Sequence, residues 1–171
     1  FRYKDLDGNG SITAEGDRAN LGKCVPSWTY GINASIDWKG IDFSMVWQGV
    51  AGNKIFDATR RTDIPTMNQP KYVLNRWTGE GSTNEYPRFT VTDPNQNWSK
   101  ASDFFIKDAS YFRLKNVTLG YTLPAKWTNK AFIKKLRVYV ACENALTFTK
   151  YDGFDPEIAD NVDRGIYPQS R

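Results

Sequence analysis

The sequence of 171 residues contains no histidine and only two cysteines, and these shortages exclude whole classes of function. Without histidine there is no Ser-His-Asp or Cys-His nucleophile pair and no histidine-ligated zinc or haem. Cys24 and Cys142 cannot form a four-cysteine metal site, and we expect two separate thiols rather than a bridge. The longest uncharged run, Cys24 to Ile36, is far shorter than the roughly 20 apolar residues of a spanning helix, which excludes transmembrane helices.

Charge of one sign is also lacking, because 23 basic residues face 19 acidic ones. The densest basic cluster is only Lys134 and Lys135, with Lys130 and Arg137 nearby. A nucleic-acid-binding protein would combine a basic stripe with a recognition motif, so we expect no nucleic-acid partner. The chain opens at Phe1 with neither an initiator Met nor a signal-peptide pattern, and we expect a piece of a longer protein.

What the sequence does contain is strict alternation of apolar and polar residues. It runs through 28–38 and, after Lys39-Gly40, through 41–48, which predicts two long strands joined by a two-residue turn. Residues 116–123 alternate in the same way and extend upstream to Tyr111, and a fourth strand is expected over 136–147. The stretch 125–135 between these two strands predicts a short amphipathic helical turn on Trp127, Ala131 and Ile133.

The connections between these strands are very unequal in length. Short turns alternate with long polar segments, 51–108 and 148–171, as in outer-membrane barrels with aromatic girdles at both interfaces. Trp28, Trp38 and Trp47 lie near strand ends, where girdles belong. Alternation alone fits a soluble β-sandwich equally well. The difference in loop length favours the barrel, because a compact soluble domain rarely contains so long a connection without structure of its own.

Several blocks of sequence together resemble the C-terminal barrel of the SusC/RagA family of TonB-linked outer-membrane transporters. They cover nearly the whole chain in the family's order: KDLDGNG (4–10), TYGINASIDWKGIDFSMVWQGVAGN (29–53), RWTGEGSTNEYPR (76–88), DASYFRLKNVTLGYTLP (108–124) and RVYVACENALTFTKYDGFDPE (137–157). The last seven residues, GIYPQSR (165–171), are similar to the segment that precedes the family's last strand. We expect that last strand to be missing here.

The resemblance implies an all-β protein: a transmembrane antiparallel β-barrel fragment with four of the last strands of a large barrel. It implies hairpins at 27–50 and 109–147, with long extracellular loops at 1–26, 51–108 and 148–171. Lys39-Gly40 and 124–135 would then face the periplasm. The location implied is the cell outer membrane of a Gram-negative, Bacteroidetes-type bacterium.

The resemblance also implies a function and partners. Members of the family import nutrients, typically oligosaccharides and in some cases peptides. They work with a SusD-like surface lipoprotein, and TonB supplies energy through an N-terminal part that we expect to be absent here. Membrane lipid would be the remaining partner. The alternative that we keep is a soluble, calcium-stabilised β-sandwich that binds carbohydrate.

A local motif near the start resembles an EF-hand calcium loop. Asp5, Asp7 and Asn9 take loop positions 1, 3 and 5, and Ser11 offers its backbone carbonyl at position 7. Position 12 is glycine rather than the usual glutamate, flanked by Glu15 and Asp17, and we expect Asp17 to complete the ligand set. The alternative is an Asx turn that binds no ion. Calcium, if bound, would be structural.

The longest loop contains a second candidate site. Trp77 with Glu80, Asn84 and Arg88 combines an aromatic face for stacking on sugar rings with polar groups for hydroxyls, and could contact a ligand or the partner lipoprotein. The alternative is a loop that folds on itself through an ion pair between Arg88 and Glu80.

Pairs of carboxylates offer the remaining chemistry. Asp152 with Asp155, or Asp103 with Asp108, could in principle act as general acid and base, as in a glycan-cleaving enzyme. Nothing in the sequence perturbs either pair identifiably, and acids in loops are commonly just solvated. We therefore expect a protein without enzymatic activity.

Overall fold

The computed structural model describes residues 1–57, 71–90, 92–98, 100–153 and 155–157. The chain divides into two compact units, one of residues 1–21 with 56–106 and the other of residues 22–55 with 107–171. Each unit is described by itself.

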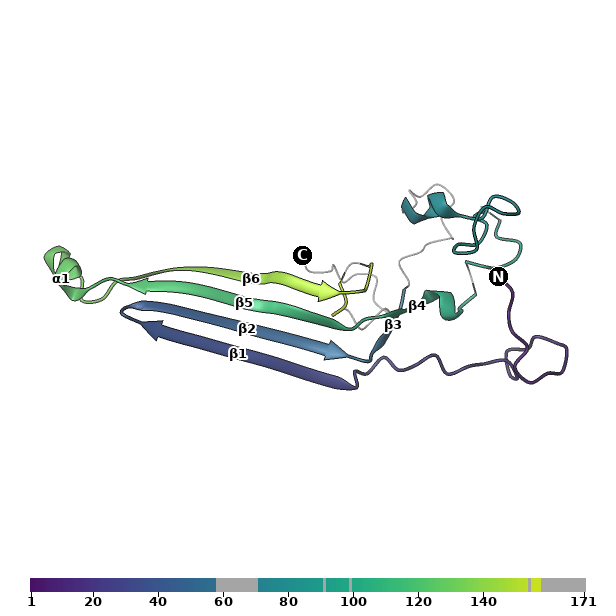
Figure 1. The fold of residues 1–171 in the computed structure, drawn as a ribbon, viewed down its shortest axis with the longest axis horizontal. Coiled ribbons are helices and arrows are strands. Elements are labelled where there is room, and N and C mark those ends of the chain that lie inside the picture. Colours follow the sequence, from purple (N-terminus) through teal and green to yellow (C-terminus); the bar gives the residue numbers. More distant parts are fainter. Residues whose placement is uncertain (58–70, 91, 99, 154, 158–171) are drawn as a thin grey trace. The chain divides into compact units, whose positions relative to one another are not determined.

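The second unit is built on a four-stranded antiparallel sheet in the order β1-β2-β5-β6 (Figure 1). Its strands are β1 (Trp28–Trp38), β2 (Ile41–Ala51), β5 (Tyr111–Thr122) and β6 (Arg137–Thr149). They lie where the alternation predicts strands, and Lys39 and Gly40 form the tight turn with φ of 49° and 87°. The predicted all-β antiparallel fold is confirmed.

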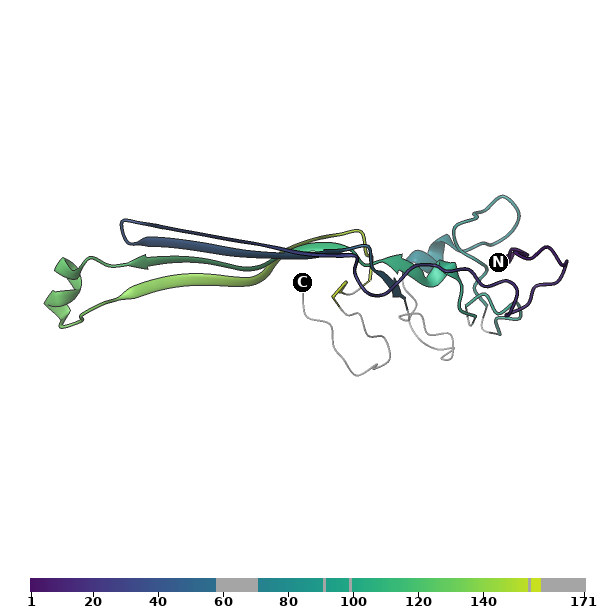
Figure 2. The same ribbon diagram turned by 90° about the horizontal axis from the view of Figure 1, so that it is seen from below.

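The alternation gives the sheet two different faces. Register pairs Ile36 with Phe43, Phe43 with Leu119 and Leu119 with Val140, so apolar side chains lie beside one another across all four strands. The residues between them on each strand form a polar face that includes Asn33, Ser44 and Thr118. Figure 2 shows the sheet edge-on as a single layer, and no second sheet covers either face among the described residues. Much of the apolar face is therefore exposed.

Two irregularities interrupt the ladders near the middle of the sheet. The register shifts between Val46 and Trp47 where β2 pairs with β5, and between Leu114 and Asn116 where β5 pairs with β6. Lys115 is the extra residue of β5 opposite β2, whereas between β5 and β6 the extra residue lies in β6, where Asn144 has a positive φ of 51°. Such β-bulges re-aim side chains without ending the strand.

The connection between β5 and β6 contains helix α1 (Ala125–Thr128) and the 3₁₀ turn η3 (Asn129–Ala131). The Leu123 amide donates to the Leu136 carbonyl at 2.9 Å and closes the base of the connection. A short helical turn is present as expected, but it does not bury an apolar face. Trp127 is 60% exposed, because only Thr128 in this turn lies against the chain.

The first unit has little regular structure. It contains the 3₁₀ turns η1 (Lys71–Asn75) and η2 (Asp103–Phe105), and an isolated bridge joins Arg76 to Tyr86. Aromatic rings hold it together, with Phe104 in edge contact with Tyr86 and Trp98. The short strands β3 (Lys54–Phe56) and β4 (Ile106–Asp108) pair at the ends of the 51–108 segment. This segment, expected only as a long loop, has structure of its own.

Among the described residues, no helix is both long enough and apolar enough to cross a membrane.

Candidate functional site

Aromatic side chains bound the apolar face of the sheet at both ends. Trp28, Tyr30 and Trp47 lie toward one end, and Trp38 and Tyr121 lie toward the other. The ten residue steps from Trp28 to Trp38 span roughly 33 Å, which a strand tilt of about 40° reduces to about 25 Å, the height of the apolar band of an outer-membrane barrel. The spacing of the two aromatic rows therefore matches a membrane thickness.

The aromatic row at the β1 start is packed. The Trp47 ring stacks on Phe112 at 4.7 Å between centroids and approaches Phe148 at 6.3 Å, while Tyr30 lies 5.8 Å from Phe112. Gly49 makes this possible, because a Cβ there would lie 2.5 Å from the Tyr30 ring. Four strands thus contribute to one continuous aromatic surface.

The polar face holds a buried network of charges centred on Arg113. Its guanidinium donates to Asp155 Oδ1 at 2.8 Å, to Thr147 Oγ1 at 2.9 Å and to Glu157. The side chains of Arg113 and Asp155 are only 2% and 3% exposed. Lys115, the bulge residue, reaches Glu157 Oε1 at 2.6 Å. The network fixes residues 155–157, which follow β6, against the polar face of β5.

This network corrects one expectation. Asp155 was expected to be a solvated loop acid that could at most pair with Asp152, but it is buried and bound to Arg113, whereas Asp152 is exposed. Sequence reasoning missed Arg113, Lys115 and Glu157. The available signal was a lone arginine at a polar position of a strand, because such a charge is buried only when it is paired.

The acidic loop near the start of the chain folds around its own carboxylates. Asp5 accepts backbone N–H groups from Gly8 and Gly10 at 2.7 and 2.8 Å, and these bonds lower the pKa of Asp5, Gly10 contributing most. Asp17 accepts from Leu6 and Thr13, both at 2.7 Å. The loop therefore contains Asx-type turns, the arrangement expected as the alternative to a calcium loop.

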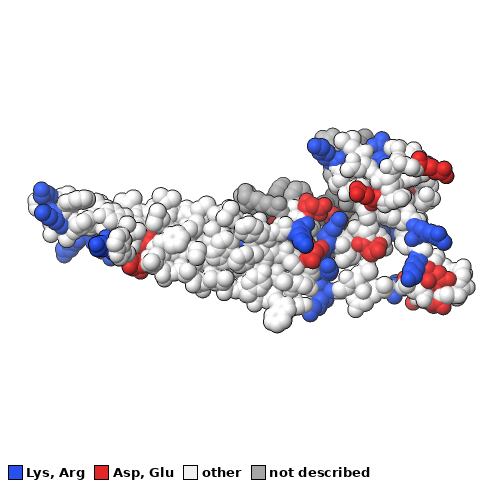
Figure 3. Space-filling view, in the orientation of Figure 1, with Lys and Arg blue, Asp and Glu red and all other residues white. Residues whose placement is uncertain are grey.

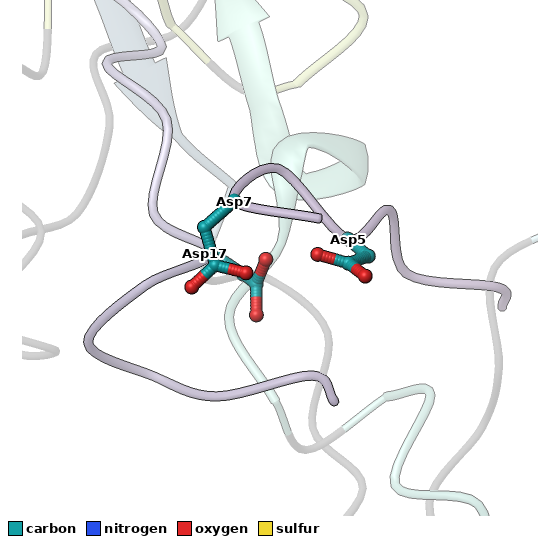
Figure 4. Close-up of side chains that lie close together, drawn as sticks. All are labelled: Asp5, Asp7 and Asp17. Carbon is teal, nitrogen blue, oxygen red and sulfur yellow. The ribbon is translucent and has the colours of Figure 1, made fainter. Parts of the chain in front are cut away.

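Asp5, Asp7 and Asp17 each bring one carboxylate oxygen to within 4.8 Å of the others (Figure 4). Two oxygens that ligate one Ca²⁺ at about 2.4 Å can lie up to about 4.8 Å apart, so the spacing fits one ion. The glycine at position 12 of the loop, Gly16, has a steric reason, because a Cβ there would lie 2.2 Å from Asp7 Oδ2. Asn9 Oδ1 accepts from Ser11 N at 2.8 Å, a bond within the loop of the same kind as those that the aspartates accept.

Three of the four residues expected in the ligand or partner loop do come together. Trp77, Asn84 and Arg88 line a pocket of about 520 Å³ in the first unit, together with Phe1, Arg2, Thr83, Tyr86, Pro87, Asn95 and Asn97. The Arg88 guanidinium lies 4.7 Å from the centroid of the Trp77 ring. Glu80 does not line the pocket.

The loop also folds on itself, but not through the expected ion pair. Ser82 Oγ accepts from Thr78 N at 3.0 Å and donates to Gly79 O at 2.7 Å, and Trp77 N donates to Tyr86 O at 3.0 Å. Arg88 stacks over Trp77 instead of pairing with Glu80. Ser82 and the backbone therefore shape this loop.

Curated proteins with similar sequences share one type of name. TonB-dependent receptor P3 of Formosa agariphila is 32% identical over 182 residues, covering 99% of this chain and 18% of that receptor. TonB-dependent receptor SusC of Bacteroides thetaiotaomicron is 25% identical over 170 residues, covering 98% of this chain and 16% of SusC. The resemblance to the SusC/RagA family is confirmed. The SusC/RagA-like chain thus spans less than a fifth of the length of these curated relatives.

Solved structures agree with the sequences. The SusC/RagA-like chain superposes on the RagAB peptide transporter with a TM-score of 0.69 and 27% identity, over 86% of this chain and 16% of that one. The RagAB peptide importer in its open-open state gives a TM-score of 0.65 at 26% identity. No protein-family model matches the SusC/RagA-like chain.

These names describe receptors and importers, in agreement with the expectation that the SusC/RagA-like chain is not an enzyme. Both cysteines, Cys24 and Cys142, are free thiols.

Proposed function

We propose that this chain forms part of the wall of an outer-membrane receptor that imports a nutrient with energy from TonB. The observation that carries the proposal is the exposed apolar face of the single-layer sheet, bounded by aromatic rows about one membrane thickness apart. Its location is the outer membrane of a Gram-negative, Bacteroidetes-type bacterium, as expected for a sequence so similar to TonB-dependent receptors. Residues 1–26, 51–108 and 148–171 are proposed to be extracellular, and 124–135 periplasmic.

The soluble β-sandwich explains the sheet less well. A sandwich covers its apolar faces with a second sheet about 10 Å away, and the described residues provide none. Ile36, Leu119 and Val140 on that face are each more than half exposed. Lipid is the cover that suits such a surface, because both strand ends place aromatic rings at the height of the headgroups.

The function is tested with the complete receptor in its own cells. We expect it to fractionate with the outer membrane and to take up labelled oligosaccharides or short peptides only when TonB is present. RagAB is described as a peptide importer, and the sequence resemblance favours oligosaccharides, so both classes are offered. Uptake that continues unchanged without TonB would contradict the proposal.

The ligand-binding loop is proposed to include Trp77, Asn84 and Arg88, and to meet either the nutrient or a SusD-like lipoprotein. The support is their arrangement around one pocket, where an aromatic ring and a guanidinium lie together. Flat rings and planar polar groups of this kind bind sugar rings and peptide groups alike.

Replacing Trp77 by alanine should weaken binding of the nutrient by about tenfold, about 1.4 kcal/mol, because the stacking surface and the support of Arg88 are lost together. Equilibrium binding to the complete receptor, with and without its lipoprotein, measures this. Glu80→Ala is the matched control, since Glu80 belongs to the same loop but does not line the pocket. Equal losses of affinity in both variants would show that the pocket is not part of the binding site.

We also propose that the loop of residues 5–17 binds a structural calcium ion through Asp5, Asp7 and Asp17, with Asn9 and the Ser11 carbonyl as further ligands. The EF-hand-like spacing and the carboxylate geometry support it. Three carboxylates on an exposed loop suit a dissociation constant of about 10⁻⁴ to 10⁻³ M, as in extracellular modules. No other metal or cofactor is proposed.

Asp7→Asn should weaken calcium binding at least about tenfold, because a charged carboxylate ligand is replaced by a neutral amide. Calorimetric titration of the complete receptor with CaCl₂ is the measurement. Glu15→Gln removes the same charge from the same loop but lies outside the carboxylate cluster, and should change nothing. Absence of any heat with millimolar calcium would leave the loop a plain Asx turn.

A further inference from the structure

The connection between β5 and β6 has a surface to which the proposed import function assigns no role. Between Leu123 and Leu136 the sequence contains no acidic residue, and its four lysines, Lys126, Lys130, Lys134 and Lys135, are all exposed. Figure 3 shows basic side chains gathered at the end of the sheet where α1 lies, while the strands beyond it are almost entirely white. The sheet thus ends in a positively charged tip.

Apolar side chains are exposed on the same connection. Trp127 is 60% exposed and Phe132 98% exposed, and Ile133 and Leu136 are each more than one-third exposed. Four basic and four large apolar side chains are therefore exposed along one short segment.

Folding of the connection does not account for the exposed ring of Phe132. Its φ is 59°, a left-handed conformation that favours glycine, and its amide closes the turn by donating to Asn129 O at 3.1 Å. Glycine would adopt this backbone conformation with less strain. The chain instead holds an aromatic ring that almost nothing in the described structure covers.

We propose that this connection, residues 124–136, docks on anionic phospholipid headgroups of the membrane leaflet at its end of the sheet. The inference rests on the proposed membrane wall, because the aromatic row of Trp38 and Tyr121 on the adjacent strand ends places the connection at a membrane surface. Lysines next to exposed aromatics are the combination that binds a negatively charged interface: the ammonium groups meet phosphates, and the rings enter the headgroup layer.

Neighbouring charges favour the same partner. Arg137, at the start of β6, is already neutralised by Asp42: its Nε lies 2.9 Å from Asp42 Oδ1 and its Nη2 lies 2.5 Å from Asp42 Oδ2. The Lys39 ammonium in the adjacent turn lies 4.9 Å from the centre of the Trp38 ring, on the same end of the sheet. The four lysines of the connection form no ion pair among the described residues. Lys135 lies near Asp42, but that carboxylate already binds Arg137, so positive charge remains for an external anion.

The test uses the complete receptor, with Cys24 and Cys142 replaced by serine and a fluorophore attached to Ala131→Cys. The receptor is reconstituted in vesicles of phosphatidylcholine alone or with phosphatidylglycerol, each containing headgroup-quencher lipid. We expect strong quenching only with phosphatidylglycerol. Each lysine beside an anionic surface contributes about fivefold, so changing all four to glutamine should lower the docked-to-undocked ratio by about 100-fold or more.

The matched control changes Lys4, Lys23, Lys71 and Lys100 to glutamine, four exposed lysines that lie outside the connection. It alters net charge equally and should leave quenching unchanged. Phe132→Gly should fold normally and still lose several-fold in the ratio, because it removes the ring but suits the left-handed turn. Folding of the fourfold variant is checked by its gel mobility before and after heating. If it fails to fold, the double variant Lys134→Gln with Lys135→Gln should show a smaller loss in the docked-to-undocked ratio.

Equal quenching in both lipids, or equal loss in the control variant, would overturn the inference. So would a label that is shielded only in cells, because the partner would then be another polypeptide. These outcomes differ from failure of the proposed function. In that case the receptor would not float with the vesicles at all.

Discussion

Arg113→Met is expected to destabilise the complete receptor by about 3 to 5 kcal/mol, the cost of leaving a buried charge without its partner. In the variant, Asp155, whose side chain is only 3% exposed, loses its ion pair with Arg113 at 2.8 Å. Thr147 and Glu157 also lose the hydrogen-bond donor that Arg113 provides. Methionine fills a similar volume, so the loss measures charge rather than packing. Urea unfolding of the receptor in neutral detergent gives the free energy.

The double variant Arg113→Met with Asp155→Leu is the informative control. It removes both charges, and most of the stability should return, because a buried ion pair is often no more stabilising than apolar residues of similar volume. If Arg113→Met alone changed the unfolding free energy by less than 0.5 kcal/mol, roughly the effect of an ordinary surface substitution, the network would not be holding residues 155–157 to the sheet.

Gly49→Ala has the second large effect, expected at about 2 to 3 kcal/mol. An added Cβ would lie 2.5 Å from the Tyr30 ring and 2.7 Å from the Tyr111 carbonyl oxygen. The ring can turn aside, but the carbonyl belongs to the paired backbone of β5 and cannot move without breaking the ladder between Gly49 and Phe112. The same unfolding measurement records the loss.

Gly31→Ala is its matched control. Gly31 lies on β1 in the same sheet, and a Cβ there would meet only the Trp47 carbonyl oxygen at 3.4 Å, close to an ordinary contact. We expect a change below about 1 kcal/mol. Equal effects at the two positions would indicate that the loss comes from glycine's backbone freedom and not from the close approach of β5.

Strands were the most predictable part of this chain. Period-2 alternation is a local signal, so Trp28–Trp38 and Ile41–Ala51 could be located to within a few residues, as could the tight turn at Lys39-Gly40. The bulge at Lys115 left no such signal, because a single extra residue changes which side chains face which side without changing the composition.

The candidate sites were predictable only as far as they are local. Asp5, Asp7 and Asp17 lie within one loop, and their spacing indicated that they could meet. The Arg113 network joins β5 to residues more than 40 positions later, and burial of that kind depends on the whole sheet. Glu80 lies outside the pocket that Trp77, Asn84 and Arg88 line, and its role in a ligand site stays a prediction.

The strand order has a consequence for how the sheet forms. The β1–β2 turn joins neighbours in sequence, and such hairpins form in about 1 to 10 μs. Pairing of β2 with β5, in contrast, must first close the segment of residues 52–110, at an extra entropic cost of roughly 3 kcal/mol relative to a two-residue turn.

Two preformed hairpins that join last along β2 and β5 are therefore the expected folding route. Gly49 lies on that late seam, so its substitution should mainly speed unfolding, whereas changes within the β1–β2 turn should mainly slow folding.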